Sequence, residues 1–384
     1  MLAACRYDPS NDRSSCDSRT LPPKPDPDEE HRSVLRRGRG ATHNPANRFR
    51  RDRRIAVDVD PVEDADAPPL ATTVSIQLAR TIIARNDSPD IPFDRSINPY
   101  QGCEHGCVYC YARPTHAYLD LSPGLDFESR LFAKPDAPAL LRAELARPGY
   151  LCRPMALGTN TDPYQPIERT WRITRGVLEV LAECAHPFTI VTKSALVERD
   201  LDLITPMAAR DMARVYVSVT TLDAGLARRL EPRAASPRRR LQAIRTLAAA
   251  GVPVGVLVAP VIPQLNDRDL EAILAAAAAA GACEAGYILL RLPLEVEPLF
   301  RDWMDTHYPL RTAHVMSLMR QLHGGRAYDP AFGVRQRGTG AFASLLEQRF
   351  AIAARRCGLD RKPPPLDTSR FAPPRGESAQ RELF

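Results

Sequence analysis

Residues 101–114, QGCEHGCVYCYARP, contain the densest set of chemically active side chains in the chain. Cys103, Cys107 and Cys110 follow the spacing Cys-x3-Cys-x2-Cys, with Tyr109 directly before the last thiol. An iron–sulfur cluster of four irons normally takes four cysteines, so three thiolates leave one iron open for an exogenous ligand. The spacing therefore indicates an iron–sulfur centre that can meet a second molecule.

A zinc site is the alternative for the same residues. His105 lies inside the loop and His116 shortly after it, and three cysteines with one histidine could complete a tetrahedral zinc site. The chain would then be a zinc-stabilised nucleic-acid-binding protein without catalysis. We expect the other six cysteines to be ordinary thiols, because a free cysteine behaves as a small hydrophobe: Cys5, Cys16, Cys152, Cys184, Cys283 and Cys357.

The elements that must position the cysteine loop alternate between strand and helix from about residue 95. One strand, SINPYQGC, leads into the loop, and continuously apolar runs predict a parallel sheet covered on both faces. Polar residues recur where these strands end, which favours a partial (β/α)6 barrel of TIM-like type, an α/β fold. The predicted strands are 154–160, 188–194, 214–221, 252–262 and 286–293, and the predicted helices are 137–146, 171–185, 196–210, 238–251 and 269–281.

Composition divides the 384 residues into a core with two polar ends. The ends are rich in Pro, Asp, Arg and Ser and bury little apolar surface, so we expect them to be disordered. The predicted parts are a basic and acidic arm at 1–70, a lead-in segment at 71–96, the barrel at 97–297, a C-terminal helical extension at 298–360 and a tail at 361–384.

The arm has nine arginines between residues 32 and 54 against the single acid Asp52. This run is either a solvated tail or a segment that contacts the phosphates of nucleic acid. No stretch approaches the length of an apolar membrane span, and the first residues lack the apolar core of a secretory signal. We therefore expect a cytoplasmic protein that does not cross a membrane; the sequence gives no indication of its oligomeric state.

The cysteine loop, with its aromatic residue before the last Cys, resembles the signature of the radical S-adenosylmethionine (SAM) superfamily, and the likeness covers about residues 90–300. The resemblance implies a 4Fe-4S cluster on Cys103, Cys107 and Cys110, with SAM on the open iron. It also implies reductive cleavage of SAM to a 5′-deoxyadenosyl radical and a reducing partner of the flavodoxin or ferredoxin type. Within the superfamily the chain resembles the group of spore photoproduct lyase and its "DNA repair photolyase"-like relatives, through NPYQGCEHGCVYCYARPTH, GTNTDPYQPIERTWRITRGVLEVL, VTKS, VSVTTLD and LEPRAASPRRRLQAI. RGRGATHNPANRF further resembles one bacterial subgroup.

The stretch GTNTDPYQPIE at the end of the second strand is where the superfamily commonly binds the amino group of SAM. Thr159, Thr161 and Asp162 can accept hydrogen bonds from an ammonium group; the alternative is a turn that begins the next helix. The resemblance also places Tyr109 near the adenine.

Three further residues follow later strands and are candidates for SAM binding. Ser218 either binds a ribose hydroxyl or is an ordinary strand hydroxyl, and Lys193 either faces the barrel mouth or extends to solvent. Arg233 either pairs with the carboxylate of SAM or forms a surface ion pair with Glu231.

One departure from the spore photoproduct lyase pattern concerns the hydrogen donor. That enzyme has a hydrogen-donating cysteine at the end of its second strand, where this chain reads Gly158-Thr159-Asn160-Thr161; Cys152 precedes the strand. Repair of thymine photoproducts is therefore not expected, whereas radical generation is. DNA or RNA is the leading substrate class, from the family likeness and the arginine run, with a small molecule or a peptide as the alternative.

Overall fold

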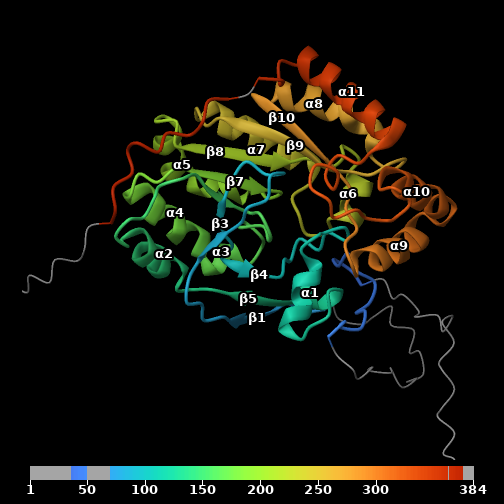
Figure 1. The fold of residues 1–384 in the computed structure, drawn as a ribbon, viewed down its shortest axis with the longest axis horizontal. Helices are drawn as coiled ribbons and strands as arrows, with labels where there is room; N and C mark the ends of the chain where they lie inside the picture. Colours follow the sequence, from blue (N-terminus) through green and yellow to red (C-terminus); the bar gives the residue numbers. More distant parts are fainter. Residues whose placement is uncertain (1–35, 50–69, 362, 375–384) are drawn as a thin grey trace, which may run out of the picture. The chain divides into compact units, whose positions relative to one another are not determined.

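The computed structural model describes residues 36–49, 70–361 and 363–374, which all belong to one compact unit, Ser33–Phe384. Its main sheet has seven strands in the order β10-β9-β8-β7-β6-β3-β2 (Figure 1). Six of them run parallel, which confirms the predicted partial barrel: β3 (Arg95–Ile97), β6 (Met155–Leu157), β7 (Phe188–Thr192), β8 (Ala213–Ser218), β9 (Val254–Val261) and β10 (Glu284–Leu289).

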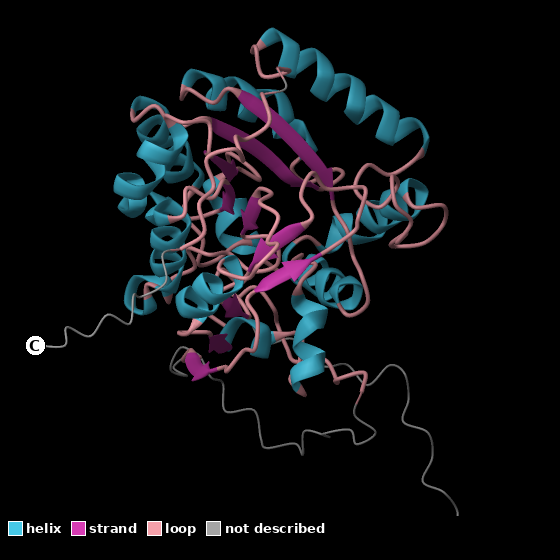
Figure 2. Cartoon of the chain, turned by 60° about the vertical axis from the view of Figure 1, so that its left-hand side comes forward, coloured by secondary structure: helices cyan, strands magenta, loops and turns pink. Residues whose placement is uncertain are grey.

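The strands form an inner layer and the helices lie around them (Figure 2). No residue of β7, β8 or β9 is exposed, as expected for a parallel sheet covered on both faces. The helices that follow the strands begin and end close to the predicted positions: α2 (Ala137–Leu145), α4 (Ile173–Glu183), α5 (Leu201–Ala208), α7 (Pro237–Ala249) and α8 (Leu270–Ala279). Shorter helical elements complete this layer: α3 (Glu168–Trp171), η3 (Ala195–Asp200), α6 (Ala224–Leu230) and η4 (Asp267–Asp269).

Helix α7 shows how local sequence sets these boundaries. The Ser236 side chain accepts a hydrogen bond from the Arg239 backbone N–H, and Pro237 occupies the first helical position, where it needs no hydrogen-bond donor. Gly251 follows the last turn with φ +79°, a left-handed conformation that glycine adopts without steric cost. The glycine stop predicted for this helix is confirmed.

The segment SINPYQGC does not form one strand, contrary to our prediction. Pro99 lacks a backbone N–H for the ladder, and the chain changes sheet at Asn98–Pro99. Strand β3 ends at Ile97 in the main sheet, and β4 (Tyr100–Gln101) pairs with β5 (Arg130–Ala133) in a second sheet, with β1 (Thr73–Ile76) on its other side. The lead-in segment also supplies β2 (Ile83–Arg85), which is antiparallel to β3.

Disorder was predicted for the whole of 1–70 and 361–384, and this is wrong for 36–49 and 363–374. The Asn47 side chain donates to Ala117 O and Leu121 O at 2.9 and 3.2 Å. In the tail, the backbone N–H of Asp367 donates to Asp211 O and that of Ala372 to Cys184 O. These polar segments find their hydrogen-bond partners on the core, which composition alone does not reveal. The rest of both predictions lies outside the described residues.

The predicted C-terminal helical extension is present as α9 (Val296–His307), α10 (Pro309–Leu322) and α11 (Gly340–Arg356). Residues 333–337 run beside edge strand β10, where the Leu289 N–H donates to Gln336 O at 2.9 Å. Arg335 reaches across to Asp90 and Ser88, in the loop that follows β2 at the opposite edge of the sheet. This contact joins the two edges of the partial barrel. Among the described residues, no helix is both long and apolar enough to cross a bilayer.

Candidate active site at the cysteine loop

The cysteine loop follows β3 and β4 and therefore lies at the carboxyl end of the first parallel strand. Cys103 and Cys107 are 7% and 8% exposed. The Cys103 N–H donates to Phe127 O at 2.9 Å, and the Cys110 N–H to Cys107 O at 3.2 Å. Gly102 has φ +74°, and a Cβ there would lie 2.6 Å from the Leu131 side chain. The loop needs glycine at this position for both its backbone conformation and its close packing.

The three thiols influence one another electrostatically. Burial, followed by the charges of Asp162, Cys107 and Cys110, raises the pKa of Cys103 well above its ordinary value. Burial and the charge of Glu231 raise the pKa of Cys107 to about 12. In the described part of the chain, no three His, Cys, Asp or Glu side chains are already set at metal-ligand geometry. The donor set nevertheless fits an iron–sulfur cluster, because three soft sulfur ligands lie on one buried loop and only a metal would offset the cost of their ionisation.

Tyr109 and Lys193 lie together beside the loop. The Tyr109 hydroxyl donates to the Glu231 carboxylate, and the Lys193 ammonium is 5.9 Å from the centre of the Tyr109 ring. Burial alone would raise the pKa of Glu231, but the charges of Arg240 and Lys193 lower it to about 2. Arg240 and Glu231 form a buried ion pair. The Lys193 ammonium therefore lies beside Tyr109 of the cysteine loop.

Two of the predicted SAM ligands instead hold the loop together. The Thr161 hydroxyl donates to Tyr100 O at 2.9 Å. Asp162 accepts hydrogen bonds from Thr192 Oγ1 and the Lys193 N–H, both at 2.7 Å, and lies 3.3 Å from His105 Nδ1. Burial would raise the pKa of Asp162, but His105 and these hydrogen bonds lower it to about 2. This carboxylate ties the ends of β6 and β7 to the cysteine loop.

The remaining predicted residues lie in different places. Ser218 is buried at the end of β8. Thr159 is half-buried, and its backbone carbonyl accepts a hydrogen bond from the Tyr111 hydroxyl. Arg233 pairs with Glu104 at 3.1 Å rather than with Glu231. Its backbone N–H donates to His105 O, so Arg233 lies on the outer side of the cysteine loop.

The histidines of the zinc alternative are both engaged. His105 Nδ1 faces Asp162, and His116 Nε2 lies 2.9 Å from Arg130 O. His116 Nδ1 has no hydrogen-bond partner in the described structure. His116 packs against the rings of Phe127 and Phe132, and within the described residues no set of three His, Cys, Asp or Glu side chains that includes it could hold a metal.

A buried carboxylate beneath the loop was missed by the sequence analysis. Glu128, in α1 (Leu125–Ser129), pairs with Arg113, in η2 (Arg113–Leu119), and both side chains are fully buried. Arg113 also donates to Cys107 O at 2.9 Å. The Glu128 carboxylate accepts the N–H groups of Gly40 and Ala41 at 2.9 and 2.8 Å. Nothing in the local sequence around Glu128 or Arg113 signals that the two side chains meet.

Residues 36–49 therefore form a strap over the cysteine loop. A Cβ on Gly40 would overlap the carbonyl oxygen of Gly106, so the two backbones are in direct contact. Arg39 donates to Glu128 O, Leu70 O and Thr72 Oγ1. Arg48 pairs with Glu295 at 2.7 Å. Two arginines of the basic run, the buried Arg39 and the exposed Arg48, thus make contacts within the protein. Arg36 and Arg37 are exposed.

Gln165 was also missed, although it lies within the quoted GTNTDPYQP stretch. It is fully buried, accepts the Glu104 N–H at 2.9 Å and donates to Gly102 O at 3.1 Å. One side-chain amide therefore contacts the loop just before and just after Cys103. The sequence feature that could have identified Gln165 is its place among the turn residues that follow an apolar strand.

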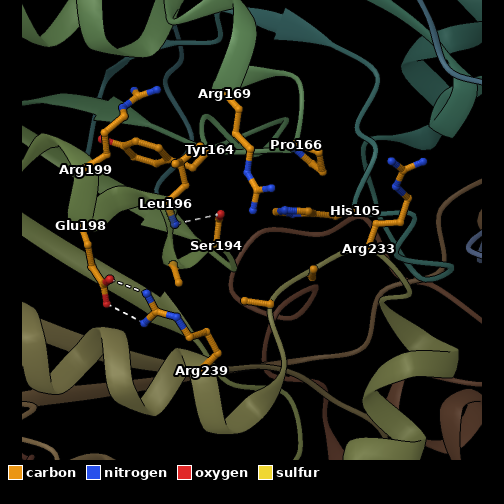
Figure 3. A pocket seen from close by; sticks show the side chains of 13 residues that line it. His105, Tyr164, Pro166, Arg169, Ser194, Leu196, Glu198, Arg199, Arg233 and Arg239 are labelled. Atoms are coloured by element: carbon orange, nitrogen blue, oxygen red, sulfur yellow. Dashed lines mark hydrogen bonds and ion pairs between the residues drawn. The ribbon is translucent and has the colours of Figure 1, made fainter.

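A pocket of about 470 Å³ lies against the outer side of the cysteine loop (Figure 3). His105 lines it, together with residues from α3, η3 and the segment that leads into α7. None of its lining residues belongs to a strand. Ser218 does not line the pocket, whereas Ser194 and Ala195, which directly follow Lys193, do.

Comparison with known proteins gives the family. The Radical SAM superfamily matches residues 97–277. An uncharacterised protein of Mycobacterium tuberculosis is 37% identical over 282 residues, which cover 72% of this chain and 79% of that protein. An uncharacterised protein of Methanocaldococcus jannaschii is 28% identical over 173 residues, or 45% of this chain and 62% of that protein.

Among solved structures, spore photoproduct lyase complexed with dinucleoside spore photoproduct superimposes with a TM-score of 0.52 and 18% identity. The match covers 74% of this chain and 79% of the lyase. At this identity the likeness concerns the fold. The three-thiol loop, the six parallel strands and these matches agree: the chain is an enzyme of the radical SAM superfamily and shares its fold with spore photoproduct lyase.

Proposed function

We propose that this enzyme holds a 4Fe-4S cluster on Cys103, Cys107 and Cys110 and uses SAM to start radical chemistry on nucleic acid. The observation that carries the proposal is the buried three-thiol loop at the carboxyl end of the first parallel strand, the end of such a barrel where active sites are built. When bound, the cluster and SAM would supply one-electron cleavage of SAM to methionine and a 5′-deoxyadenosyl radical. Family membership favours this over the zinc-binding alternative.

The chain's own residues prepare the loop for this role. Lys193 places a cation near Cys107, where its charge opposes the rise of the thiol pKa and so favours the thiolate. The Glu231–Arg240 pair fixes the Tyr109 ring beside Lys193. The Asp162 carboxylate already accepts hydrogen bonds within the protein. The Thr161 hydroxyl donates to Tyr100 O but keeps its acceptor lone pairs, so Thr161 stays a candidate for direct contact with SAM beside Thr159, Ser218 and Lys193.

Nucleic acid is proposed as the substrate class on two grounds. The fold is shared with a lyase solved in complex with dinucleoside spore photoproduct. Arg36 and Arg37, at the start of the strap, are exposed and can pair with phosphates. A small molecule or a peptide is the alternative substrate for the same radical machinery.

Anaerobic reconstitution with iron and sulfide tests the proposal. We expect a brown protein that releases 5′-deoxyadenosine from SAM in the presence of a strong reductant, with more product when single-stranded or duplex oligonucleotides are added. A colourless protein that binds zinc and never forms 5′-deoxyadenosine contradicts the radical chemistry. Product formation that no DNA or RNA stimulates contradicts the nucleic acid substrate and favours the alternative.

A further inference from the structure

The pocket on the outer side of the cysteine loop has a positively charged lining. Arg169, Arg199, Arg233 and Arg239 line it, with Glu198 as the one acidic lining residue. Figure 3 shows Arg169 and Arg233 on either side of His105, while Arg239 is paired with Glu198. Three of the four guanidinium groups are paired with carboxylates, so Arg169 supplies the unbalanced positive charge of this lining. The N–H groups that those pairs leave unused can still donate to an anion.

Three of these arginines are held in place by carboxylates. Arg199 pairs with Glu168 and Asp200, whose side chains are fully buried behind the pocket wall. Arg233 pairs with Glu104, which is 5% exposed. Arg239 pairs with Glu198 at the rim. Guanidinium groups fixed in this way lose little side-chain freedom when an anionic partner binds.

Arg169 differs from the other three. Its side chain is exposed, and within the described residues it makes no hydrogen bond or ion pair. It is the cation on this surface that a partner can engage without first displacing an internal carboxylate. It is also the position where a substitution should disturb the fold least.

The place of the pocket limits what its occupant can be. His105 stands two residues from Cys103 and from Cys107 and forms part of the lining. A partner seated here therefore lies against the loop that would hold the cluster. No strand residue lines the pocket, and Ser218 is absent from its lining, although Ser194 next to Lys193 contributes to it. The position suits a partner that exchanges electrons with the cluster better than a substrate that must enter the barrel.

We propose that this pocket and its arginines dock the electron donor, a low-potential one-electron carrier with an acidic surface, such as a flavin or iron–sulfur protein. The inference rests on the proposed function, which requires one electron from outside for each cleavage of SAM. The donor is oxidised by one electron and the cluster is reduced by one, and no atom or proton is transferred. Carboxylates on the donor would pair with Arg169 and with the exposed faces of Arg233 and Arg239.

The experiment measures binding separately from catalysis. Full-length enzyme, reconstituted anaerobically, is titrated with an oxidised acidic flavodoxin and, in parallel, with a bacterial ferredoxin. Arg169→Glu replaces an attractive charge by a repulsive one and should weaken binding by about 10-fold at low salt, with the difference shrinking at high salt. The matched control is Arg147→Glu, an exposed arginine at the turn that precedes β6, at the opposite end of that strand.

A second measurement separates this proposal from the proposed function. With photoreduced deazariboflavin, an uncharged reductant, Arg169→Glu should form 5′-deoxyadenosine at the wild-type rate, while reduced flavodoxin or ferredoxin should support it several-fold more slowly. No product from wild type with deazariboflavin would sink the radical chemistry itself. Equal donor binding by wild type and Arg169→Glu, or no saturable binding of either donor to wild type, would overturn the docking site. A loss confined to oligonucleotide binding would assign the pocket to nucleic acid instead.

Discussion

The buried Glu128–Arg113 ion pair allows a direct test of which contacts stabilise the cysteine loop. Replacing Glu128 by Gln keeps the side-chain shape but removes the charge that faces the fully buried Arg113 guanidinium. It also removes the charge from the acceptor of the Gly40 and Ala41 N–H groups. Breaking one partner of a buried pair costs about 3–5 kcal/mol, because the other charge stays buried without compensation.

That cost should be visible as a shift in thermal stability. The entropy of unfolding is about 2.1 cal/mol/K per residue, which is roughly 0.7 kcal/mol/K for a folded region of this size. Tm should therefore fall by about 4–7 °C. The assay is thermal unfolding of the metal-free protein, followed by circular dichroism. The control is Glu183→Gln in the exposed pair with Arg142, where the loss should stay under about 1 kcal/mol.

The iron content of the two variants tests whether the Glu128–Arg113 pair also supports metal binding by the cysteine loop. Because Arg113 contacts the Cys107 carbonyl, Glu128→Gln should also bind less iron on reconstitution, while Glu183→Gln should match wild type. Equal Tm values for Glu128→Gln and wild type would refute the claim that this pair anchors the loop. A lower Tm with full iron content would confine the role of Glu128 to stability.

Replacing Cys107 by Ala should abolish iron binding and SAM cleavage, and Cys184→Ala should preserve both; full iron and sulfide content in the Cys107 variant would contradict the ligand assignment. Gly40→Val should displace the strap and reduce iron retention in air. Gly225→Ala should not, because its added Cβ meets only side-chain ends, the Asp223 carboxylate at 3.1 Å and the Arg229 guanidinium at 3.8 Å. Burial lowers the pKa of His186 from 6.5 to about 4 in the folded protein. As the pH falls, His186 therefore takes up its proton in the unfolded chain before it does so in the folded protein. The free energy of unfolding should fall by about 3 kcal/mol as the pH drops from 6.5 to 4. In His186→Gln, urea unfolding should show a flatter pH dependence over that range, and an unchanged slope would contradict the pKa. Because no thiol lies in 158–161, dinucleoside spore photoproduct should not be repaired even while SAM is cleaved, and multi-turnover repair, counted per 5′-deoxyadenosine, would show that another hydrogen donor serves.

Much of the barrel could be predicted from the sequence because its signals are local. Apolar runs ending in turn residues placed β6 to β10, and glycine stops placed the ends of α7 and α8. The thiol spacing predicts the chemistry in the same way, since the three thiols lie within eight residues on one loop. The end of a predicted strand also placed Lys193 at this edge of the sheet, while the direction of its side chain stayed open.

Other contacts depend on groups far apart in the chain, and only the tertiary structure decided them. Asp162 has the right type for binding an ammonium group, yet its oxygens meet Thr192 and His105 within the protein. The strap was expected to be disordered because its composition is polar, but Glu128 supplies the acceptors for its N–H groups from 88 and 87 residues away. Local sequence determines which elements form and which thiols can share a metal. Which polar groups are free for a ligand depends on whether folding brings them a partner, and hydrogen bonds over such separations leave no pattern in the neighbouring residues.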